Sequence, residues 1–458
     1  MFKRLNAFLS LLLMILLPLL MQCQNQETKN SAMYDPVPEW AGDAVIYELF
    51  VRDFTPEGTF KATEAKIPYL KALGVDIVWL MPIFPIGEKG RKGTLGSPYS
   101  VKNYYEVNPE FGSKEDFRSL VQAVHQAGMK IIIGFVPNHS ANDYVEMTNH
   151  PDWFMRDANG NFTREVKDWS DVTDFNYDNP ELRKHIINIM QYWITEFDID
   201  GYRCDVAGMV PDDFWKEAVP QIKKIKPDVF LLAEWEDHKF IEFGFAADYS
   251  WKLLHALFDL RKYSKTISQV VNIYKEKYRR YFPQGRFLNF IENHDEPRAV
   301  KKFGRDYLKP YAAFVFATPG LPLLFMGQEF GDTNYNSSAS LFDKVTINWQ
   351  DFDSTLFQFY KKLVDLRHTF PVNLSQWQTL KVDDQNRTAV IAEILEDKAM
   401  FVILNFSDKK QTIAFSLPAS LTKMQQQPAL EWFSGETINL LKNNEILVDA
   451  NDVKILLK

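Results

Sequence analysis

The chain has 458 residues, of which 46% are hydrophobic, 14% aromatic and 24% charged, and its formal charge is −8. This composition is typical of a globular protein and excludes a disordered, collagenous or disulfide-scaffold chain. Its length fits either roughly three ordinary domains of about 150 residues or one α/β barrel of about 250 residues with a smaller domain. Because nucleic-acid binding depends on Lys and Arg contacts with phosphate, the acidic balance argues against a nucleic-acid partner.

The first residues have the pattern of an export signal. Lys3 and Arg4 precede an apolar run over residues 8–21, which is too short to span a bilayer comfortably. Cys23 follows this run, and the whole segment resembles a bacterial lipoprotein signal. The resemblance implies that Cys23 becomes lipid-modified. An ordinary signal peptide with an incidental cysteine is the alternative.

We therefore expect a signal peptide over residues 1–22 and a lipid-anchored spacer over residues 23–39. The protein would then be exported and held at a membrane, on the periplasmic side or at the cell surface. The only other cysteine is Cys204, so acylation of Cys23 would rule out an internal disulfide.

From about Trp40 onward, apolar strand-like runs alternate with segments of helical periodicity. Gly74 and Gly128 end two predicted helices, and Ser113 with Asp116 forms an N-cap signature. The predicted strands cover residues 44–54, 75–84, 129–136, 201–207, 229–235, 286–292 and 321–325. The predicted helices cover residues 64–73, 113–128, 180–197, 211–225, 311–317 and 356–367.

This alternation predicts a parallel sheet with right-handed crossovers, that is, an α/β fold. No Gly-x-Gly-x-x-Gly motif follows the first strand, so a dinucleotide-binding fold loses support. About eight strand–helix units fit a (β/α)8 TIM barrel over residues 40–375, with the sixth unit within residues 246–277. A polar excursion over residues 139–178 follows strand three, and short alternating strands over residues 376–458 predict an antiparallel β domain.

Active residues of such a barrel lie at the C-terminal ends of its strands. Four predicted strands end with polar or ionisable residues: Asn138 and His139 after the third, Arg203 and Asp205 in the fourth, Glu234 in the fifth, and His294 and Asp295 after the seventh. A single acid at a strand end is usually a solvent-exposed loop residue without a catalytic role. Three acids and two histidines at the same end predict a shared site.

The three carboxylates Asp205, Glu234 and Asp295 would repel one another, so at least one should be protonated near neutral pH. Glycoside hydrolysis needs this combination, with one carboxylate as nucleophile and one carboxylic acid as proton donor. Arg203 lies two residues before Asp205, on the same side of the strand, and could keep it ionised. The alternative is an internal salt-bridge network that closes the barrel without catalysis.

The same residues lie in segments that resemble the signature segments of the α-amylase family of glycoside hydrolases. The matching segments, in order, are residues 135–139, 201–207, Glu234 and 290–295, with further likeness in residues 47–112, 174–176 and 320–329. The resemblance implies a catalytic barrel, an excursion domain after strand three and a C-terminal β-sandwich.

The resemblance also implies roles for individual residues. Asp205 matches the family's nucleophile, Glu234 its general acid/base and Asp295 the third acid, which holds sugar hydroxyls. The implied sugar contacts are Tyr99, His139, Arg203, His294 and, three residues beyond Asp295, Arg298. Tyr99 would stack under the sugar ring, since a flat apolar face suits the C–H face of glucose. For Arg298 a surface ion pair is the alternative.

Gly134 and Asn138 are two further positions in the segments that carry this resemblance. Gly134 stands where the family usually has an Asp that supports the arginine, so we expect Gly134→Asp to raise turnover or leave it unharmed. Asn138 resembles a calcium ligand of many relatives, although no acidic calcium loop is visible in the sequence. The resemblance therefore allows a calcium cofactor and implies no other.

The leading hypothesis is a retaining hydrolase of α-glucosidic bonds, α-1,4 above all, in starch-like glucans or maltooligosaccharides. A transglycosylase or an oligosaccharide-trimming member of the same family is the alternative within the enzyme class. A non-catalytic surface lipoprotein that binds glycan is the alternative from another class. Because relatives without catalysis usually lack one of the three acids, the presence of all three favours an enzyme. Endo or exo action, chain-length preference and the linkage itself stay open.

Overall fold

The computed structural model describes residues 36–396, 398–417, 421, 428–441 and 443–458. The expected signal peptide, Cys23 and most of the expected spacer lie outside these residues. Val37 to Lys458 pack as one unit. In this described part, none of the helices combines the length and the apolar character needed to cross a membrane.

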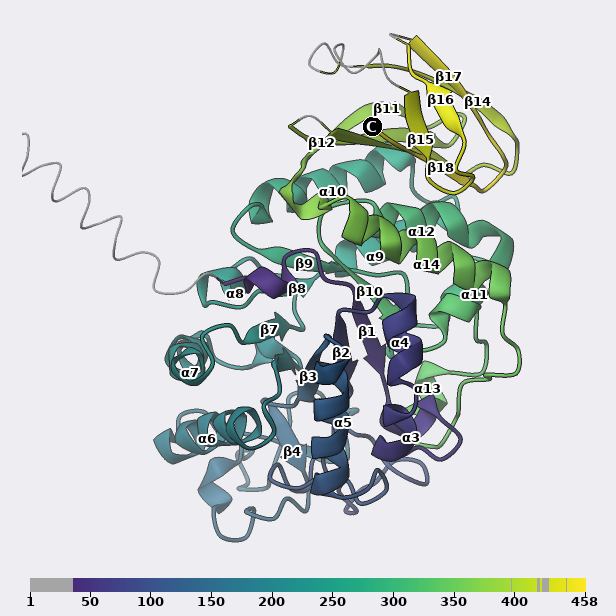
Figure 1. Cartoon of the computed structure of the whole chain (residues 1–458). Helices are drawn as coiled ribbons and strands as arrows, with labels where there is room; N and C mark the ends of the chain where they lie inside the picture. Colours follow the sequence, from purple (N-terminus) through teal and green to yellow (C-terminus); the bar gives the residue numbers. More distant parts are fainter. Residues whose placement is uncertain (1–35, 397, 418–420, 422–427, 442) are drawn as a thin grey trace, which may run out of the picture. The chain divides into compact units, whose positions relative to one another are not determined.

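Eight parallel strands close into a barrel in which each strand pairs with the next one along the barrel sequence (Figure 1). The strands are β1 (Ile46–Leu49), β2 (Ile77–Leu80), β3 (Lys130–Phe135), β6 (Gly201–Cys204), β7 (Phe230–Ala233), β8 (Ala247–Tyr249), β9 (Arg286–Asn289) and β10 (Leu321–Phe325). Their residues are almost all buried, because a closed parallel sheet is covered on both faces. The predicted (β/α)8 barrel is confirmed.

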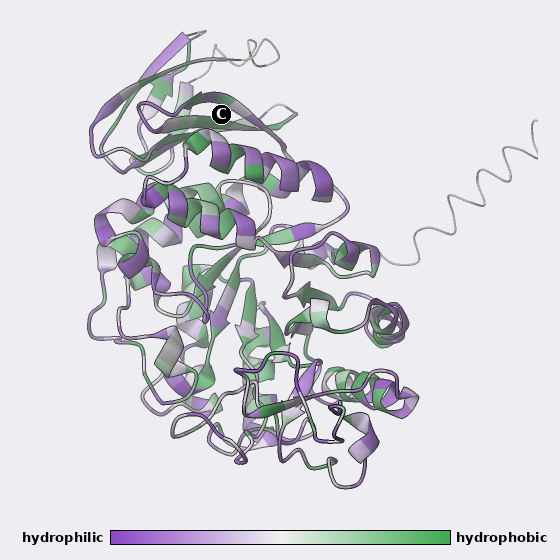
Figure 2. Ribbon diagram, turned by 180° about the vertical axis from the view of Figure 1, so that it is seen from behind, coloured by the Kyte–Doolittle hydropathy of each residue, from purple (hydrophilic) through white to green (hydrophobic). Residues whose placement is uncertain are grey.

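Helices surround this barrel, and Figure 2 shows apolar strands inside a ring of helices with polar outer surfaces. The helices are α2 (Val51–Phe54), α3 (Phe60–Glu64), α4 (Ile67–Leu73), α5 (Lys114–Gln126), α6 (Pro180–Phe197), α7 (Asp212–Ile225), α8 (Lys239–Glu242), α9 (Trp251–Arg261), α10 (Ile267–Tyr281), α11 (Ala299–Lys302), α12 (Leu308–Phe316), α13 (Ser337–Ser340) and α14 (Ser354–Thr369). Short 3-10 turns η1 (Glu39–Ala41), η2 (Pro151–Trp153), η3 (Ala207–Met209), η4 (Arg305–Tyr307), η5 (Gln328–Phe330) and η6 (Val372–Leu374) complete the set.

Local sequence signals account for several helix ends. Ser113 and Asp116 form the capping box that the sequence predicts for α5, each side chain accepting from the other residue's backbone N–H. Gly74 adopts a left-handed conformation with φ of 97° and ends α4. These signals need only neighbouring residues, which is why they can be read from the sequence.

The first predicted strand is too long. The strand over residues 44–54 ends at Leu49, and Val51 to Phe54 form the short helix α2. Long-range contacts hold this turn, since Arg52 pairs with Glu110 at 2.9 Å and the Asp53 side chain accepts from the Val345 N–H. Apolar periodicity alone cannot register such contacts.

The structure of the sixth barrel unit explains why its sequence signal is weak. Its strand β8 has only three residues and is followed by two helices, α9 and α10, in place of one. A three-residue strand is shorter than the apolar run that identifies a buried strand.

The excursion between β3 and α6 contains a two-stranded antiparallel sheet, β4 (His139–Ala141) with β5 (Val172–Asp174). After α14 the chain forms antiparallel sheets, and the first of their strands begins at Gln376. One sheet contains β11 (Gln376–Asp383), β12 (Thr388–Leu395), β13 (Lys398–Asn405), β18 (Val453–Leu457), β15 (Pro428–Glu431) and β16 (Thr437–Asn439), and the other pairs β14 (Gln411–Ser416) with β17 (Asn443–Val448). The C-terminal sheets pack beside α10 and α12, away from the excursion (Figure 1).

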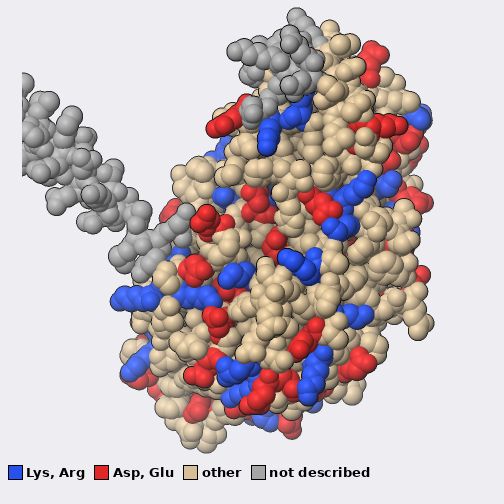
Figure 3. Space-filling view, in the orientation of Figure 1, with Lys and Arg blue, Asp and Glu red and all other residues tan. Residues whose placement is uncertain are grey.

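Charged side chains are spread over the surface. Figure 3 shows Lys and Arg interspersed with Asp and Glu on the visible face. Opposite charges at this spacing cancel one another at a distance, so this face carries no strong field of a single sign.

Gly134 lies in β3 directly opposite Arg203 of β6, as the resemblance predicted for the position of the missing acid. The space beside it is already filled. A Cβ atom on Gly134 would lie 2.8 Å from Pro82 Cδ and 3.0 Å from the Pro82 nitrogen. These contacts argue against the expectation that Gly134→Asp raises turnover, because the added side chain would have to displace Pro82.

We expect Gly134→Ala to lower the free energy of unfolding by about 1–3 kcal/mol, the usual cost of overpacking a core. The measurement is the thermal midpoint and the urea midpoint of the purified chain. Gly42→Ala is the matched control, because its added Cβ would make an ordinary contact at 3.4 Å with a backbone oxygen. Equal midpoints for Gly134→Ala and the wild type would show that Pro82 moves aside readily.

Candidate active site

A cavity of about 180 Å3 opens where the barrel strands end. Its lining comes from several strands and from the excursion: Lys92, Ser97, Tyr99, His139, Trp169, Asp171, Val172, Asp205, Val206, Glu234, His294, Asp295, Leu341 and Phe342. Six residues predicted from the sequence are among them, namely the three acids, Tyr99 and both histidines. Arg203 lies directly beneath, bonded to Asp205.

The buried guanidinium of Arg203 holds two of the acids at once. Its Nη1 donates to Asp205 Oδ1 at 2.6 Å, and its Nη2 forms an ion pair with Glu234 Oε1 at 2.7 Å. The remaining Nε donates to the Tyr249 hydroxyl at 3.1 Å. Because β6 and β7 are paired neighbours with Cys204 opposite Ala233, the two acids leave adjacent strands at the same level.

Glu234 carries a raised pKa, which reaches about 8. Burial is the main cause, and the nearby Asp205 and Asp295 carboxylates add to it, whereas Arg203 and the Val206 N–H oppose it. The Val206 N–H donates to Glu234 Oε2 at 2.6 Å. Val206 itself has φ of 35°, an unusual conformation for a β-branched residue. Near neutral pH, Glu234 can therefore supply a proton.

His294 lies in a chain of polar groups that starts at a buried acid. Its Nδ1 is 2.5 Å from Glu48 Oε1, and its Nε2 is 2.6 Å from the Tyr99 hydroxyl and 3.3 Å from Asp295 Oδ2. Burial lowers the pKa of His294, as does Arg203, but Asp295 and Glu48 outweigh both and raise it to about 8. The imidazolium form can donate from both nitrogens, which orders Tyr99 and Asp295 around the cavity.

His139 also lines the cavity and is buried, and burial lowers its pKa. The Asn138 amide nitrogen donates to His139 Nδ1 at 3.2 Å and lies 3.4 Å from Asp174 Oδ1. Trp169 of the excursion packs against the imidazole, with ring centroids 5.2 Å apart. The neutral imidazole is therefore fixed in orientation by groups from both sides of the excursion.

The contacts of Asn138 bear on the calcium expectation. Its amide nitrogen, which cannot bind a cation, faces the nearest carboxylate, Asp174. Nowhere in the described part of the chain do three or more His, Cys, Asp or Glu side chains gather as metal ligands. A calcium cofactor stays a prediction, and no chemical step below uses a metal.

Arg298 differs from both of its predicted roles. It is 1% exposed and does not line the cavity, so it is neither a sugar contact nor part of a surface ion pair. Its Nη1 lies 3.0 Å from Glu292 Oε1, its Nε donates to the Asp332 carbonyl and its Nη2 donates to the Met326 carbonyl. Arg298 thus joins the loops that follow β9 and β10 beneath the site.

Sequence reasoning missed several residues around the cavity. Glu48 is the third residue of β1 and lies inside the strand predicted over residues 44–54, so the strand-end rule does not find it. Tyr249 ends β8, the strand whose sequence signal was weakest. Lys92, Trp169 and Phe342 come from long loops, where no sequence spacing indicates proximity to a strand end.

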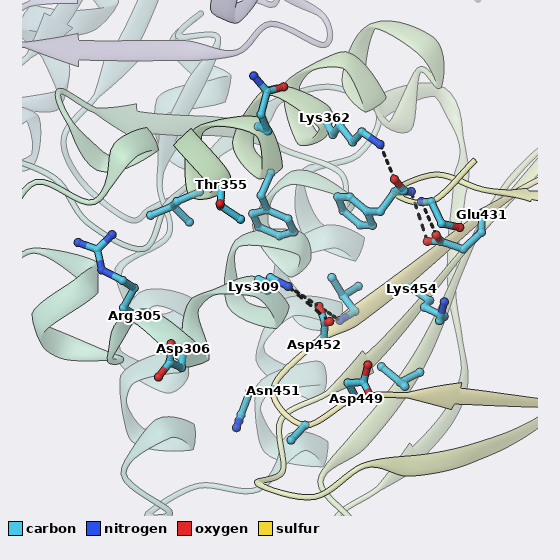
Figure 4. Close-up of a pocket in the computed structure, with 18 of the residues that line it drawn as sticks. Arg305, Asp306, Lys309, Thr355, Lys362, Glu431, Asp449, Asn451, Asp452 and Lys454 are labelled. Atoms are coloured by element: carbon cyan, nitrogen blue, oxygen red, sulfur yellow. Dashed lines mark hydrogen bonds and ion pairs between the residues drawn. The ribbon is translucent and has the colours of Figure 1, made fainter. Parts of the chain in front are cut away.

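A larger cavity of about 620 Å3 lies between barrel helices and the C-terminal sheets (Figure 4). Lys309 of α12 faces Asp452 across it at 3.4 Å, and Lys362 of α14 donates to the Phe433 carbonyl. These contacts connect barrel and sheets, and no barrel strand end reaches this cavity. The smaller cavity at the strand ends is therefore the better candidate active site.

The family model described as "Alpha amylase, catalytic domain" matches residues 24–355 of this chain. The chain belongs to the α-amylase family of glycoside hydrolases. A maltogenic α-amylase of Thermotoga neapolitana has a solved structure with a TM-score of 0.83 and 30% identity, over 91% of this chain and 99% of that one. An α-amylase structure from Lactobacillus plantarum has a TM-score of 0.80, also at 30% identity, over the same shares of the two chains.

Curated sequences of the family show the same relationship. The chain is 27% identical to α-amylase MalA of Haloarcula japonica over 84% of its own length, and it spans 58% of that relative. It is 26% identical to a maltogenic α-amylase of Bacillus acidopullulyticus over 93% of its own length, and it spans 79% of that relative.

The raised pKa of Glu234 predicts how glycoside cleavage depends on pH. Since the acid form is lost as pH rises through about 8, we expect kcat/KM to fall there. His294 titrates in the same range, so Glu48→Gln separates the two groups. This variant removes the carboxylate beside His294 and should lower the pKa of that imidazole. If Glu234 controls the rate, the fall of kcat/KM should still occur near pH 8. If kcat/KM falls at a lower pH in Glu48→Gln than in the wild type, the fall reports His294 and not Glu234.

Proposed function

We propose that this glycoside hydrolase cleaves α-glucosidic bonds, α-1,4 bonds above all, in starch-like glucans or maltooligosaccharides with retention of configuration. The observation that carries the proposal is the pair of acids on one guanidinium, Asp205 and Glu234 on Arg203. Two carboxyls held by neighbouring nitrogens of a single group stay close together. A covalent route requires roughly 5–5.5 Å between them, whereas an inverting route requires roughly 6.5–9.5 Å.

In the first step, Asp205 is the nucleophile. Arg203 occupies its Oδ1, so Oδ2 is the oxygen that attacks the anomeric carbon. As the bond from Oδ2 to that carbon forms, the bond to the leaving oxygen breaks and Glu234 transfers its proton to that oxygen. The products are a glucosyl ester of Asp205, a free sugar hydroxyl and a Glu234 carboxylate.

In the second step, Glu234 acts as the base. It takes a proton from water as the water oxygen attacks the anomeric carbon, and the ester bond to Asp205 breaks. The product sugar keeps its α configuration, and both acids return to their starting states. Asp295 and His294, which lie 3.3 Å apart, are placed to hold hydroxyls of the same sugar ring.

The substrate part of the proposal draws on the relatives. One of the matching solved structures and one of the matching curated sequences, from different organisms, are each named maltogenic α-amylase. The small cavity, with Tyr99 and Trp169 in its wall, supports a short stretch of sugar units inside the site.

Proton NMR of the first-formed sugar tests the stereochemistry. We expect an α-anomer from an α-glucan, because two displacements at one carbon restore its configuration. A β-anomer that appears first would contradict the double displacement.

Two variants test the separate roles of the acids. Asp205→Ala should abolish the covalent intermediate and cleavage with it, which mass spectrometry with a slow fluorinated substrate can check. Glu234→Ala should still form the intermediate from a substrate with a very good leaving group, but hydrolyse it slowly. Equal loss on good and poor leaving groups would contradict the assignment of Glu234 as the acid.

We also propose that the chain is exported and anchored at a membrane through a lipid on Cys23. The support is the order of charged, apolar and cysteine residues at the start of the sequence. We expect Cys23→Ser to move the protein from the membrane fraction to the soluble fraction and to abolish labelling with a fatty-acid probe. Gln26→Ser, a polar change three residues on, is the control and should leave both unchanged. A Cys23→Ser variant that stays at the membrane would refute the lipid anchor.

A further inference from the structure

The loop between β2 and α5 contributes Lys92 to the wall of the cavity. The Lys92 Nζ donates to the Asp168 carbonyl at 2.5 Å and lies 3.5 Å from Asp171 Oδ1, which holds the lysine to the excursion. The same Nζ lies 5.9 Å from the centre of the Phe342 ring, on the loop after β10. One side chain thus connects three loops around the barrel mouth. Its exposed fraction of 31% shows that its outer side faces water.

The β2 loop and the β10 loop are joined along their backbones next to Lys92. The Leu95 N–H and the Gly96 N–H both donate to the Phe342 carbonyl, at 2.9 Å and 3.1 Å. A Cβ atom on Gly93 would lie 2.5 Å from Phe342 Cβ, so the two backbones meet too closely to admit a ligand between them. Lys92 bridges the distance from this joint to the excursion.

The order of the barrel strands places this wall opposite Glu234. In the closed barrel β1 lies four strands from β7 in either direction, and β2 and β10 are the neighbours of β1. The loops that carry Lys92 and Phe342 follow β2 and β10, whereas Glu234 follows β7. The Asp295 side chain, after β9, is 40% exposed, whereas that of Asp171 beside Lys92 is 6% exposed. The cavity is therefore open at the acids after β7 and β9 and walled at Lys92.

This placement decides which part of a glucan would meet the wall. A general acid gives its proton to the leaving oxygen, so the leaving sugar lies on the Glu234 side of the cleaved bond. The sugar that Asp205 attacks carries the rest of the chain, toward its non-reducing end, to the opposite side. Pockets that enclose a drug-sized ligand measure about 300–1,000 Å3. The cavity of about 180 Å3 is smaller and is walled on that side, so it suits the end of a chain better than its middle.

We propose that Lys92 closes the cavity on the side of the retained sugar, so that the enzyme attacks glucans from their non-reducing ends. This inference rests on the proposed function and deepens it, because the substrates become chain ends and the first products short sugars of one size. Lys92 determines specificity in this proposal and takes no part in bond cleavage. Its contacts with Asp168 and Asp171 keep the wall in place.

The test compares two substrates that differ at the non-reducing end only: maltoheptaose, and maltoheptaose with a 4,6-O-ethylidene block on that end. We expect the wild type to cleave the free-ended sugar and to leave the blocked one almost intact. Lys92→Ala should raise the ratio of kcat/KM for the blocked sugar to kcat/KM for the free one roughly tenfold, because interior bonds become accessible. On starch, the variant should lose the iodine colour with fewer bonds cleaved than the wild type.

Three further variants control for effects other than the wall. Phe342→Ala removes the other side of the contact and should raise the same ratio. Lys92→Arg keeps both the charge and the reach, so it should retain the wild-type ratio. Lys89→Ala is the matched control, since Lys89 lies in the same loop, is exposed and does not line the cavity. Its ratio should equal that of the wild type.

The outcomes separate this inference from the proposed function. A wild type that cleaves blocked and free substrates equally well would overturn the closed wall. If Lys92→Ala still excludes the blocked sugar as the wild type does, Lys92 is not the residue that closes the cavity. If the wild type cleaves neither substrate, the proposed function fails, and this inference fails with it.

Discussion

The buried guanidinium of Arg203 is the interaction on which the site depends. A cation that is 1% exposed is costly unless it is paired, and here Asp205, Glu234 and the Tyr249 hydroxyl surround it. Neighbouring strands of one closed barrel deliver these partners at the same level. The fold therefore sets the spacing of the two acids. Arg203 contacts both carboxyl groups and so fixes their orientation.

Each cation around the cavity is in direct contact with acidic groups. With Glu234 protonated, Asp205, Asp295 and Glu48 face Arg203 and the His294 imidazolium. Arg203 contacts Asp205 and the protonated Glu234, and His294 contacts Glu48 and Asp295, so each cation links two of the four acidic groups. Glu48 belongs to this set although it lies below the cavity, because His294 connects it to the surface that a sugar would touch.

The sequence predicts the barrel and most of the cavity because both obey local rules. Asp205, Glu234 and Asp295 each follow an apolar run, and the C-terminal ends of parallel strands meet by construction. Arg298 shows the limit of this reasoning. It stands close to Asp295 in sequence, yet its guanidinium turns to Glu292 and to loop carbonyls, a choice made by tertiary packing. Residues delivered by long loops, such as Lys92 and Trp169, have no local signal at all.

Gly134 illustrates a different limit. Related motifs usually have an Asp at this position. In this chain the glycine lets Pro82 pack close to the strand. The position opposite Arg203 is filled by a proline ring, and Arg203 takes its charge partners from its own strand and the next. A missing residue in a motif therefore has to be interpreted together with the atoms that replace it.

The left-handed backbone of Val206 has a consequence for how this site can evolve. A β-branched residue at positive φ stores on the order of 1–3 kcal/mol of strain, and the surrounding fold must supply that energy. The strain aims the Val206 N–H at Glu234 and so connects the peptide after the nucleophile to the acid. Glycine would relieve this strain, but its greater backbone freedom would hold the N–H that contacts Glu234 less firmly. Selection for stability and selection for a firmly held acid thus act in opposite directions at one residue that is itself neither the nucleophile nor the acid.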